Sequence, residues 1–350
     1  MAWKWHSNRF ALHMRSAGPP YTLDRSLVDR ASELLRAGQL VGFPTETVYG
    51  LGADASNQQA LERLYKVKGR PANHPVIVHI GSFEQLSNWA ADVPEAAPKL
   101  AQAFWPGPLT LVLRKSDRVL GELTGGQDTV AIRVPRHPVA LALLEAFRGG
   151  IAAPSANRFG RLSPTTAQAV AEEFGDEVAM VLDGGPCQVG IESTILDLSG
   201  KQPAVLRPGM ILAADIEKVL GVPVKAAGET VRGPRAPGGL PKHYAPRARL
   251  RLLGRPELEQ EVERLAAGGS APAVLAFSPA PEKWSHLSWI CAPRDPVQYA
   301  HDLYGNLRYL DSGSCHLIVV EAVPEAAEWV AIYDRLVRAA GLAPSGGGQA

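Results

Sequence analysis

Residues 38–80 place apolar runs, polar turns and one amphipathic helix in the order strand, turn, helix, turn, strand. The run 40–43 predicts a short strand, and residues 49–52, after a Pro-Thr-Glu-Thr turn, predict a tight glycine-rich passage. Asn57 suits the N-cap of a helix, and the apolar residues that follow it share one helical face. A second strand over 76–80 completes the unit. Alternation of strands and helices predicts an α/β fold.

The turn after that helix fixes the position of two cations. Gly69 permits a left-handed exit and Pro71 prevents the helix from continuing, so the backbone holds Lys68 and Arg70 at one place. Arginine binds phosphate or carboxylate through two parallel hydrogen bonds, whereas lysine acts as a point charge. The ordinary alternative is a solvated surface cluster. Because the backbone is restricted here, the pattern favours an anion site, without saying which anion.

Composition excludes several classes of protein. With 350 residues, 46% hydrophobic and 20% charged, the chain can build sizeable cores in two domains. The net charge of +1 predicts no strong general attraction to nucleic acid or anionic lipid. Three isolated cysteines without a CxxC pair argue against a disulfide framework or zinc knuckle, and fit a reducing cytoplasm. No apolar run reaches the length of a membrane span.

Changes in composition divide the chain into segments. The beginning is basic and contains Gly-Pro-Pro, which predicts a flexible extension, and the glycine-rich end predicts a disordered tail. Proline and glycine crowd the region after the first domain, which predicts a linker. The expected segments are 1–22 (extension), 23–229 (first domain), 230–248 (linker or lid), 249–342 (smaller α/β domain) and 343–350 (tail).

Hydrophobic periodicity predicts the elements of both domains. In the first domain, strands are expected over 40–43, 76–80, 109–114, 129–134, 151–153, 178–183, 193–197 and 204–207, and helices over 24–37, 83–89, 98–104, 138–147 and 163–174. In the smaller domain, strands over 250–253, 273–277, 289–292 and 317–320 alternate with helices over 257–267, 295–311 and 327–340, which predicts a parallel sheet. The helix over 163–174 is expected to be capped by its Ser-Pro-Thr-Thr start.

Residues 50–55, Gly-Leu-Gly-Ala-Asp-Ala, resemble a dinucleotide-binding fingerprint. The next helix begins too late to place a phosphate at its N-terminus, so this motif is discounted. The sequence contains no Walker A motif either. Any bound nucleotide therefore depends on side-chain cations and hydroxyls.

Polar residues at strand ends are stronger candidates, because ligands of open α/β sheets bind beyond the ends of the strands. They are Thr45, Lys68, Arg70, His79, Thr129, Arg133, Ser155, Asn157, Ser163, Ser193 and Arg207. Plainer interpretations exist: Thr45 and Ser163 are common turn or cap residues, and His79 has the pattern of a core histidine. Arg133 and Arg207 would be costly to bury unpaired, so each either meets an acid or binds an anion.

Seven sequence blocks carry a resemblance to a known family. They are GFPTETVYGLGADA, KGRPANHPVIVHI, FWPGPLTLVL, VAIRVPRHP, APSANRFGRLSPTTA, IESTILDL and LRPGMI. Together they resemble the YrdC-like domain of threonylcarbamoyl-AMP synthases, and the linker APGGLPKHYAP with the following region is similar to the long, two-domain members. The resemblance implies a YrdC-like open twisted sheet with flanking helices, plus a smaller Rossmann-like parallel α/β domain.

The resemblance also implies an activity. Such enzymes are nucleotidyltransferases that convert L-threonine, bicarbonate or carbon dioxide, and ATP into threonylcarbamoyl-adenylate and pyrophosphate. A separate transferase complex then modifies tRNA, so that complex is the expected partner, with at most weak tRNA contact and no membrane contact. Mg²⁺ is expected to accompany ATP without a protein metal site, and the expected location is the cytoplasm.

Residue roles follow from the same resemblance. ATP contacts are expected from Lys68, Arg70, Thr129, Ser155, Asn157, Ser163, Arg207 and Tyr244, with Lys68 and Arg70 also expected to be catalytic. Threonine contacts are expected from Thr45, His79, Arg133, the Ala153 backbone and Ser193. Tyr244 would close over the nucleotide. Catalysis would consist of alignment and electrostatic stabilisation, without a protein nucleophile.

Two departures from the family pattern and two rival functions stay open. Gly239 replaces a methionine of the family's linker, and the last helix reads AIYDRLVRAA where an Asn-Arg pair is expected. Carbamoyl-adenylate formation for hydrogenase maturation uses a similar domain, but with an acylphosphatase unit and CxxC pairs that this sequence lacks. The other rival is a non-enzymatic RNA-binding module, which the net charge of +1 disfavours.

Overall fold

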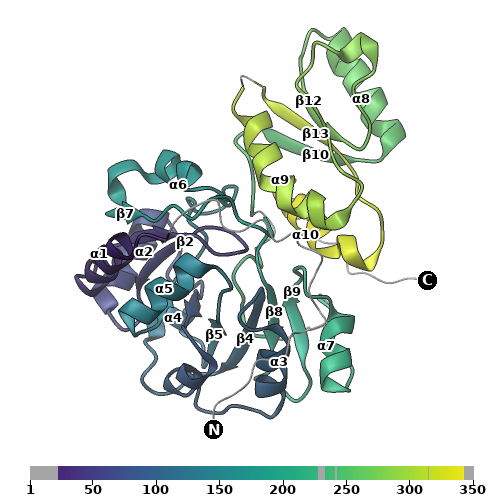
Figure 1. The fold of residues 1–350 in the computed structure, drawn as a ribbon. Helices are drawn as coiled ribbons and strands as arrows, with labels where there is room; N and C mark the ends of the chain where they lie inside the picture. Colours follow the sequence, from purple (N-terminus) through teal and green to yellow (C-terminus); the bar gives the residue numbers. More distant parts are fainter. Residues whose placement is uncertain (1–22, 228–232, 241–242, 314, 343–350) are drawn as a thin grey trace.

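The structure is a computed structural model, and it describes residues 23–227, 233–240, 243–313 and 315–342. These residues form a larger domain, drawn in purple to teal in Figure 1, and a smaller domain, drawn in green to yellow. The expected extension 1–22 and tail 343–350 lie outside the described residues, as does part of the expected linker.

In the described part of the first domain, nine strands form one mixed sheet in the order β7-β1-β2-β6-β3-β5-β4-β8-β9. The strands are β1 (Val41–Phe43), β2 (Gly50–Asp54), β3 (Ile77–His79), β4 (Leu109–Arg114), β5 (Thr129–Arg133), β6 (Ile151–Ala152), β7 (Met180–Val181), β8 (Thr194–Asp197) and β9 (Ala204–Arg207). β3 and β5 are parallel and pair His79 with Arg133, so these two side chains lie at the same end of the sheet.

Helices flank this sheet and confirm the predicted fold class (Figure 1). They are α1 (Arg25–Arg36), α2 (Gln58–Lys68), α3 (Ala96–Phe104), α4 (Gly121–Thr124), α5 (Pro138–Phe147), α6 (Ala167–Phe174) and α7 (Ala213–Leu220). α1 begins after its cap Asp24 and packs with α5 in one apolar cluster through residues such as Leu35 and Leu143. α7 was not predicted, and the predicted helix over 83–89 is a 3₁₀ helix, Phe83–Asn88.

The two predicted ends of α2 are confirmed. The Asn57 side chain accepts a hydrogen bond from the Ala60 amide at 3.2 Å, and Gly69 ends the helix with a φ of 67°. A residue with a Cβ is strained at such a φ, so glycine suits this exit. The turn therefore holds Lys68, the last residue of α2, and Arg70 as the sequence indicates. The predicted start of α6 is corrected within its motif: Thr166, not Ser163, caps that helix.

The expected tight passage at 49–52 is wrong, because residues from Gly50 onward form β2. This strand pairs antiparallel with both β1 and β6. A Cβ added to Gly52 would lie 3.0 Å from Phe43 Cε1 and 3.0 Å from Ile151 Cγ2. Glycine is therefore used here for close packing between neighbouring strands, and not for reversal of the chain.

Replacing Gly52 with alanine is expected to lower the free energy of unfolding by about 1–3 kcal/mol, because the added methyl group overpacks a buried site. The change Gly121→Ala is the matched control, since a Cβ there meets no heavy atom within 4 Å. Urea titrations of both variants test this. Equal stability of Gly52→Ala and the wild-type protein would contradict the packing role of this glycine.

The smaller domain has the predicted parallel sheet. Its described strands are β10 (Arg249–Leu253), β11 (Ala273–Ala276), β12 (Trp289–Cys291) and β13 (Leu317–Glu321), in the order β10-β13-β11-β12 and parallel throughout. The helices are α8 (Arg255–Ala267), α9 (Pro296–Asp311) and α10 (Val330–Ala339). Within the described residues of the whole chain, no helix has the length and apolar character that a membrane crossing requires.

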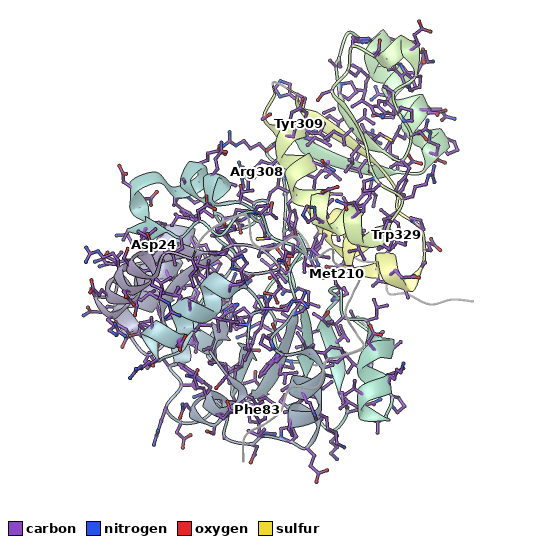
Figure 2. The ribbon with its side chains drawn as sticks, viewed as in Figure 1. Asp24, Phe83, Met210, Arg308, Tyr309 and Trp329 are labelled. Atoms are coloured by element: carbon purple, nitrogen blue, oxygen red, sulfur yellow. The ribbon has the colours of Figure 1, made fainter. Side chains whose placement is uncertain are left out.

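α9 and α10 face the first domain (Figure 1). Their apolar residues share one buried cluster with Val48, Leu162 and Ile191 of the first domain, and Met210 packs against this cluster. Figure 2 shows Met210 between the domains and Arg308 on α9, whose guanidinium donates to the Leu162 carbonyl oxygen at 3.2 Å. The second domain is thus packed directly against the region that carries the predicted site residues.

Candidate active site

A cavity lies where the ends of the parallel strands β3 and β5, the turn before β2 and the described part of the linker meet. This part, residues 233–240 and 243–248, is called the connecting segment below. Its walls come from widely separated parts of the chain: Thr45, Thr47, Val48, Tyr49, Gly50, Arg70, Ile77, His79, Arg133, Ala153, Pro154, Ser155, Glu192, Ser193, Arg207, Pro237, Gly238, His243 and Tyr244. The free volume between them is about 40 Å³. Small-molecule pockets usually offer roughly 300 Å³ or more, so the connecting segment fills part of this space.

One end of the cavity contains a buried ion pair. The Arg133 guanidinium lies 2.8 Å from the Glu46 carboxylate, and both side chains are almost fully buried. Its Nη1 donates to Thr47 Oγ1 at 2.9 Å, and its Nε donates to the Gly107 carbonyl at 3.1 Å. Each Nη carries two hydrogens; Nη1 uses one of them, and Nη2 forms an ion pair with Glu46 without a well-aligned hydrogen bond, so both keep N–H groups for another acceptor. Arg133 therefore meets an acid, as one of the two expectations had it, and keeps donors for an anion as well.

Small hydroxyl groups surround this arginine. Thr45 Oγ1 donates to the Val48 carbonyl at 2.7 Å and lies 2.8 Å from Thr47 Oγ1. Ser193 Oγ lies 2.8 Å from Thr110 Oγ1 on β4. Thr47 thus links Thr45 to Arg133, and Ser193 Oγ also accepts from Arg207 Nη2 at 3.2 Å. Hydroxyl groups held in one cavity beside guanidinium groups suit recognition of a small polar molecule.

The other end of the cavity is cationic. Lys68 Nζ donates at 2.6 Å to the carbonyl oxygens of both Ser155 and Asn157. Arg70 donates to the Pro75 carbonyl at 2.6 Å, and Arg207 donates to the Ser193 carbonyl at 2.9 Å. All three side chains are buried; Arg70 and Arg207 line the cavity, and Lys68 lies directly behind its wall at Ser155. Among the described residues, these cations bond to carbonyl and hydroxyl oxygens and form no ion pair, which leaves their charge available to an anionic ligand.

Burial acts on the titration of these groups. It lowers the pKa of Lys68 well below its usual value, and the neighbouring Arg70 lowers it further. Burial also lowers the pKa of Arg70 to about 10. An approaching polyanion would favour the charged forms and reverse both effects, so ligand charge and protein charge stabilise each other.

Buried histidines border the cavity at both ends. His79 and His243 are each buried, and the Nδ1 atom of each lacks a hydrogen-bond partner. Burial, with the nearby charge of Arg133, lowers the pKa of His79 to about 3. Burial, together with Lys68 and Arg70, lowers that of His243 to about 3. Both rings are therefore neutral at physiological pH.

These histidines predict a loss of stability in acid. Below pH 6.5 the unfolded histidine binds a proton and the folded one does not, so stability falls with pH until about pH 3. Between pH 7 and pH 5, each histidine is expected to remove about 2 kcal/mol of unfolding free energy. Urea titrations at both pH values measure this. His79→Gln should reduce the pH dependence and the exposed control His286→Gln should not; an unchanged slope in His79→Gln would contradict it.

Glu192 is a cavity residue that sequence analysis missed. Its carboxylate accepts from Ser163 Oγ at 2.6 Å, from the Tyr304 hydroxyl of α9 at 3.0 Å and from Arg335 Nε of α10 at 2.8 Å. Burial would raise the pKa of Glu192, but Arg335 and Arg207 outweigh it and hold that pKa at about 2. The only local sequence signal that Glu192 belongs to the site was its position beside Ser193. Nothing in the sequence around Arg335 marks Arg335 as the partner of Glu192.

Tyr244 of the connecting segment lies at the centre of the site. Its φ is 58°, its side chain is buried and its hydroxyl lacks a hydrogen-bond partner. The His243 ring lies 4.1 Å from the Tyr244 ring, centroid to centroid, and the Arg335 guanidinium lies 5.0 Å from the Tyr244 ring centroid. A buried, unbonded hydroxyl and a strained backbone are costly, which indicates a residue placed for function.

The structure brings most of the predicted residues together. Those that line the cavity are Thr45, Arg70, His79, Arg133, Ala153, Ser155, Ser193, Arg207 and Tyr244. Lys68, Asn157 and Ser163 lie directly behind this wall. Lys68 Nζ and the Asn157 amide donate to the Ser155 carbonyl, and Ser163 Oγ donates to Glu192. Thr129 is apart: it begins β5, four residues and about 13 Å of strand from Arg133. Missed besides Glu192 are Glu46, Thr47 and His243.

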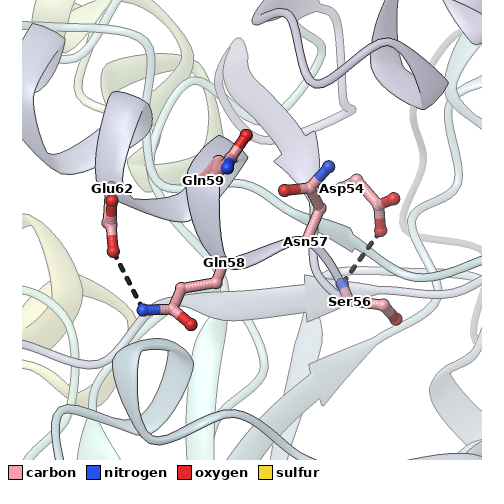
Figure 3. Close-up of a pocket in the computed structure, with 6 residues that line it drawn as sticks. All are labelled: Asp54, Ser56, Asn57, Gln58, Gln59 and Glu62. Carbon is pink, nitrogen blue, oxygen red and sulfur yellow. Dashed lines mark hydrogen bonds between the residues drawn. The ribbon is translucent and has the colours of Figure 1, made fainter.

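A second hollow, shown in Figure 3, lies at the start of α2 and contains none of the predicted residues. It is lined by Asp54, Ser56, Asn57, Gln58, Gln59 and Glu62. Its polar groups already bond to one another: Ser56 N donates to Asp54 at 2.9 Å, and Gln58 Nε2 donates to Glu62 at 3.0 Å. These local bonds are those of an ordinary helix start.

Comparisons with known proteins agree with this architecture. A family model described as "Telomere recombination" matches residues 33–209, and one described as "Threonylcarbamoyl-AMP synthase, C-terminal domain" matches residues 211–341. The threonylcarbamoyl-AMP synthase of Pyrococcus abyssi is 42% identical over 322 residues, covering 89% of this chain and 93% of that protein. The Bacillus subtilis threonylcarbamoyl-AMP synthase is 40% identical over 323 residues, covering 90% of this chain and 93% of that protein.

The likeness extends to three dimensions. A crystal structure of P. abyssi Sua5 complexed with L-threonine superposes with a TM-score of 0.86 at 39% identity, covering 92% of this chain and 96% of that one. Sequence and structure thus match over both domains. This chain belongs to the threonylcarbamoyl-AMP synthase family of enzymes.

Proposed function

We propose that the cavity beneath Tyr244 is where this enzyme brings together L-threonine, bicarbonate and ATP to form threonylcarbamoyl-adenylate and pyrophosphate. The observation that carries this assignment is the division of charge along the cavity. Arg133 is balanced by Glu46 at one end, whereas Lys68, Arg70 and Arg207 bond to carbonyl oxygens at the other. The first end suits a small zwitterion, and the second suits a polyphosphate.

The Arg133 end would hold threonine. The remaining N–H groups on the two Nη atoms of Arg133 can bind a carboxylate bidentately. Thr45 and Ser193 would meet the substrate's hydroxyl and amine, the Ala153 backbone would close the wall, and neutral His79 would offer its unbonded Nδ1 as an acceptor. The related P. abyssi protein binds L-threonine in its crystal structure, which supports a threonine site in this chain.

The cationic end would hold ATP. Lys68, Arg70 and Arg207 would bind the phosphates, and Ser155, Asn157 and Ser163 would border them. Thr129 would contact the nucleotide farther along β5. The present free volume of about 40 Å³ is too small for ATP. Tyr244 would therefore move aside when ATP enters and then close over the bound nucleotide.

The proposed reaction requires alignment and charge stabilisation. Bicarbonate gives carbon dioxide and hydroxide, and the neutral threonine amine adds to the carbon dioxide to give a carbamate, releasing a proton that the hydroxide takes up as water. The carbamate oxygen then attacks the α-phosphorus of ATP while the bond to pyrophosphate breaks. Lys68 and Arg70 stabilise the negative charge that develops on the phosphates. Holding the reactants in contact accelerates the step further. A closed linker would exclude water, which would otherwise hydrolyse the carbamate and the mixed anhydride.

Mg²⁺ does not fit a protein site here. Within the described residues, no group of three or more His, Cys, Asp or Glu side chains could hold a metal ion, and the Glu192 carboxylate is engaged by Arg335. Any Mg²⁺ would arrive on the ATP phosphates.

We propose in addition that the product passes to a tRNA threonylcarbamoyl-transferase complex in the cytoplasm, with at most weak contact between this enzyme and tRNA.

The test is pyrophosphate release from ATP, with threonine and bicarbonate each present or omitted. Release that requires both substrates is expected. Release without threonine would contradict the proposed reaction and indicate another carbamoylation or hydrolysis. If the folded protein releases none under any combination, the proposed function is wrong, and salt-dependent RNA binding becomes the next activity to measure.

A further inference from the structure

Besides its apolar cluster, the contact between the domains includes Glu192, a charged side chain of the cavity wall. Glu192 accepts hydrogen bonds from Tyr304 and Arg335, which belong to α9 and α10 of the second domain. The same carboxylate also accepts from Ser163 of the first domain at 2.6 Å. Its ionised form is therefore maintained largely by groups that the second domain supplies.

Arg335 connects three parts of the chain at once. Its Nε donates to Glu192 at 2.8 Å, its Nη1 donates to Asp334 at 2.8 Å, and its guanidinium lies 5.0 Å from the Tyr244 ring centroid. It is among the largest fully buried side chains of the described residues. Asp334 has a second partner, because Arg338 Nε donates to it at 2.9 Å. Removal of Arg335 would thus leave Glu192 without its hydrogen-bonded cation and with only the electrostatic effect of Arg207, whereas Asp334 would keep Arg338.

The position of Glu192 makes its charge matter for one substrate in particular. Glu192 lines the same cavity as Arg207, which donates to the carbonyl of the adjacent Ser193 at 2.9 Å, and its carboxylate acts electrostatically on Lys68 and Arg207. The proposed function places both of these cations on the ATP phosphates. Without Arg335, a buried negative charge would face a ligand of several negative charges, and the low dielectric would strengthen the repulsion. Arg133 has its own partner in Glu46, so the threonine end is separately neutralised.

We propose that Arg335 of the second domain is a positioning residue for ATP: it neutralises Glu192 in the cavity wall and so sets the affinity of the site for the nucleotide, but not for threonine. The inference rests on the proposed function for the identity of the anion. It gives the second domain a specific task in the reaction, namely to complete the electrostatics of a site whose phosphate ligands all come from the first domain and the linker.

The test is titration calorimetry of the full-length protein with α,β-methylene-ATP and, separately, with L-threonine. Because this measures binding, its outcome is separate from that of the pyrophosphate assay. Arg335→Met is expected to raise the Kd for the ATP analogue about 10- to 100-fold, and to change the Kd for threonine less than about twofold. The double variant Arg335→Met/Glu192→Gln removes both charges and is expected to bring the Kd for the analogue back to within about threefold of the wild type.

Arg264→Met is the matched control. This arginine lies on α8 of the same domain, pairs with Glu261 at 2.8 Å and is 65% exposed, so its loss should change neither Kd. Nucleotide affinity that stays weak in the double variant would overturn the proposal, because the defect would then be structural. Equal weakening of nucleotide and threonine binding in Arg335→Met would overturn it too, as would unchanged nucleotide affinity.

Discussion

Replacing Lys68 with methionine is expected to lower kcat/KM for pyrophosphate release about a thousandfold. Lys68 is buried at the end of α2, and carbonyl oxygens of Ser155 and Asn157 hold its ammonium group in place. Removing one preorganised donor from the position where charge develops typically costs 10²- to 10³-fold. Methionine keeps the length and apolar stem of lysine, so the change tests the charge with little change in packing.

Lys66→Met is the matched control for this prediction. Lys66 lies on the last turn of the same helix but is exposed, so its replacement should leave the rate close to that of the wild type. Steady-state rates and thermal unfolding should be measured on both variants. A Lys68→Met protein that is folded and retains more than about a tenth of the activity would contradict the assigned role of this cation.

Replacing Arg133 with methionine is expected to raise KM for threonine about 30-fold or more. The relevant pair is the one proposed between Arg133 and the threonine carboxylate. Truncating one partner of a buried, hydrogen-bonded charge pair typically weakens binding by about 2–5 kcal/mol. The same change leaves the Glu46 carboxylate buried without its cation, which is expected to reduce folding stability by about 3–5 kcal/mol. The loss of threonine binding and the loss of stability must therefore be measured separately.

The double variant Arg133→Met/Glu46→Gln separates these two effects. Neutralising Glu46 should recover much of the stability, because no unpaired charge is then buried. Threonine affinity should stay low, because Arg133, the proposed partner of the threonine carboxylate, is still missing. Arg114→Met, at an exposed β4 position, is the surface control. Recovery of threonine affinity along with stability would show that Arg133 acts only on the fold.

Local sequence signals predicted the elements around Lys68 well. The cap at Asn57 and the left-handed Gly69 depend on residues within a few positions of each helix end, so they can be recognised without the fold. The parallel sheet of the second domain followed from its alternating pattern in the same way. The strand β2 was missed because the need for glycine at position 52 comes from close packing against Phe43 and Ile151. The contact with Ile151 arises only when β6 pairs with β2, so the local sequence does not show it.

The candidate site shows the same division. Strand-end position and the family resemblance identified Arg133 and Arg207, since both features are visible in sequence. The partner of Arg133 was not identified, because Glu46 reaches it only through the folded sheet. The Glu192–Arg335 contact spans 143 residues and joins two domains, so no local pattern could indicate it. In AIYDRLVRAA the arginine of the expected Asn-Arg pair is this partner, and the aspartate that stands in place of the asparagine accepts from Arg338.

The most direct test of the central claim is the fate of the carbon of bicarbonate. The enzyme would be incubated with ATP, L-threonine and ¹³C-bicarbonate, and the products would be analysed by mass spectrometry and ¹³C NMR. The proposed reaction gives an adenylate that contains threonine and one ¹³C atom, formed together with pyrophosphate. Consumption of ATP without incorporation of label, or a labelled adenylate that lacks threonine, would contradict it.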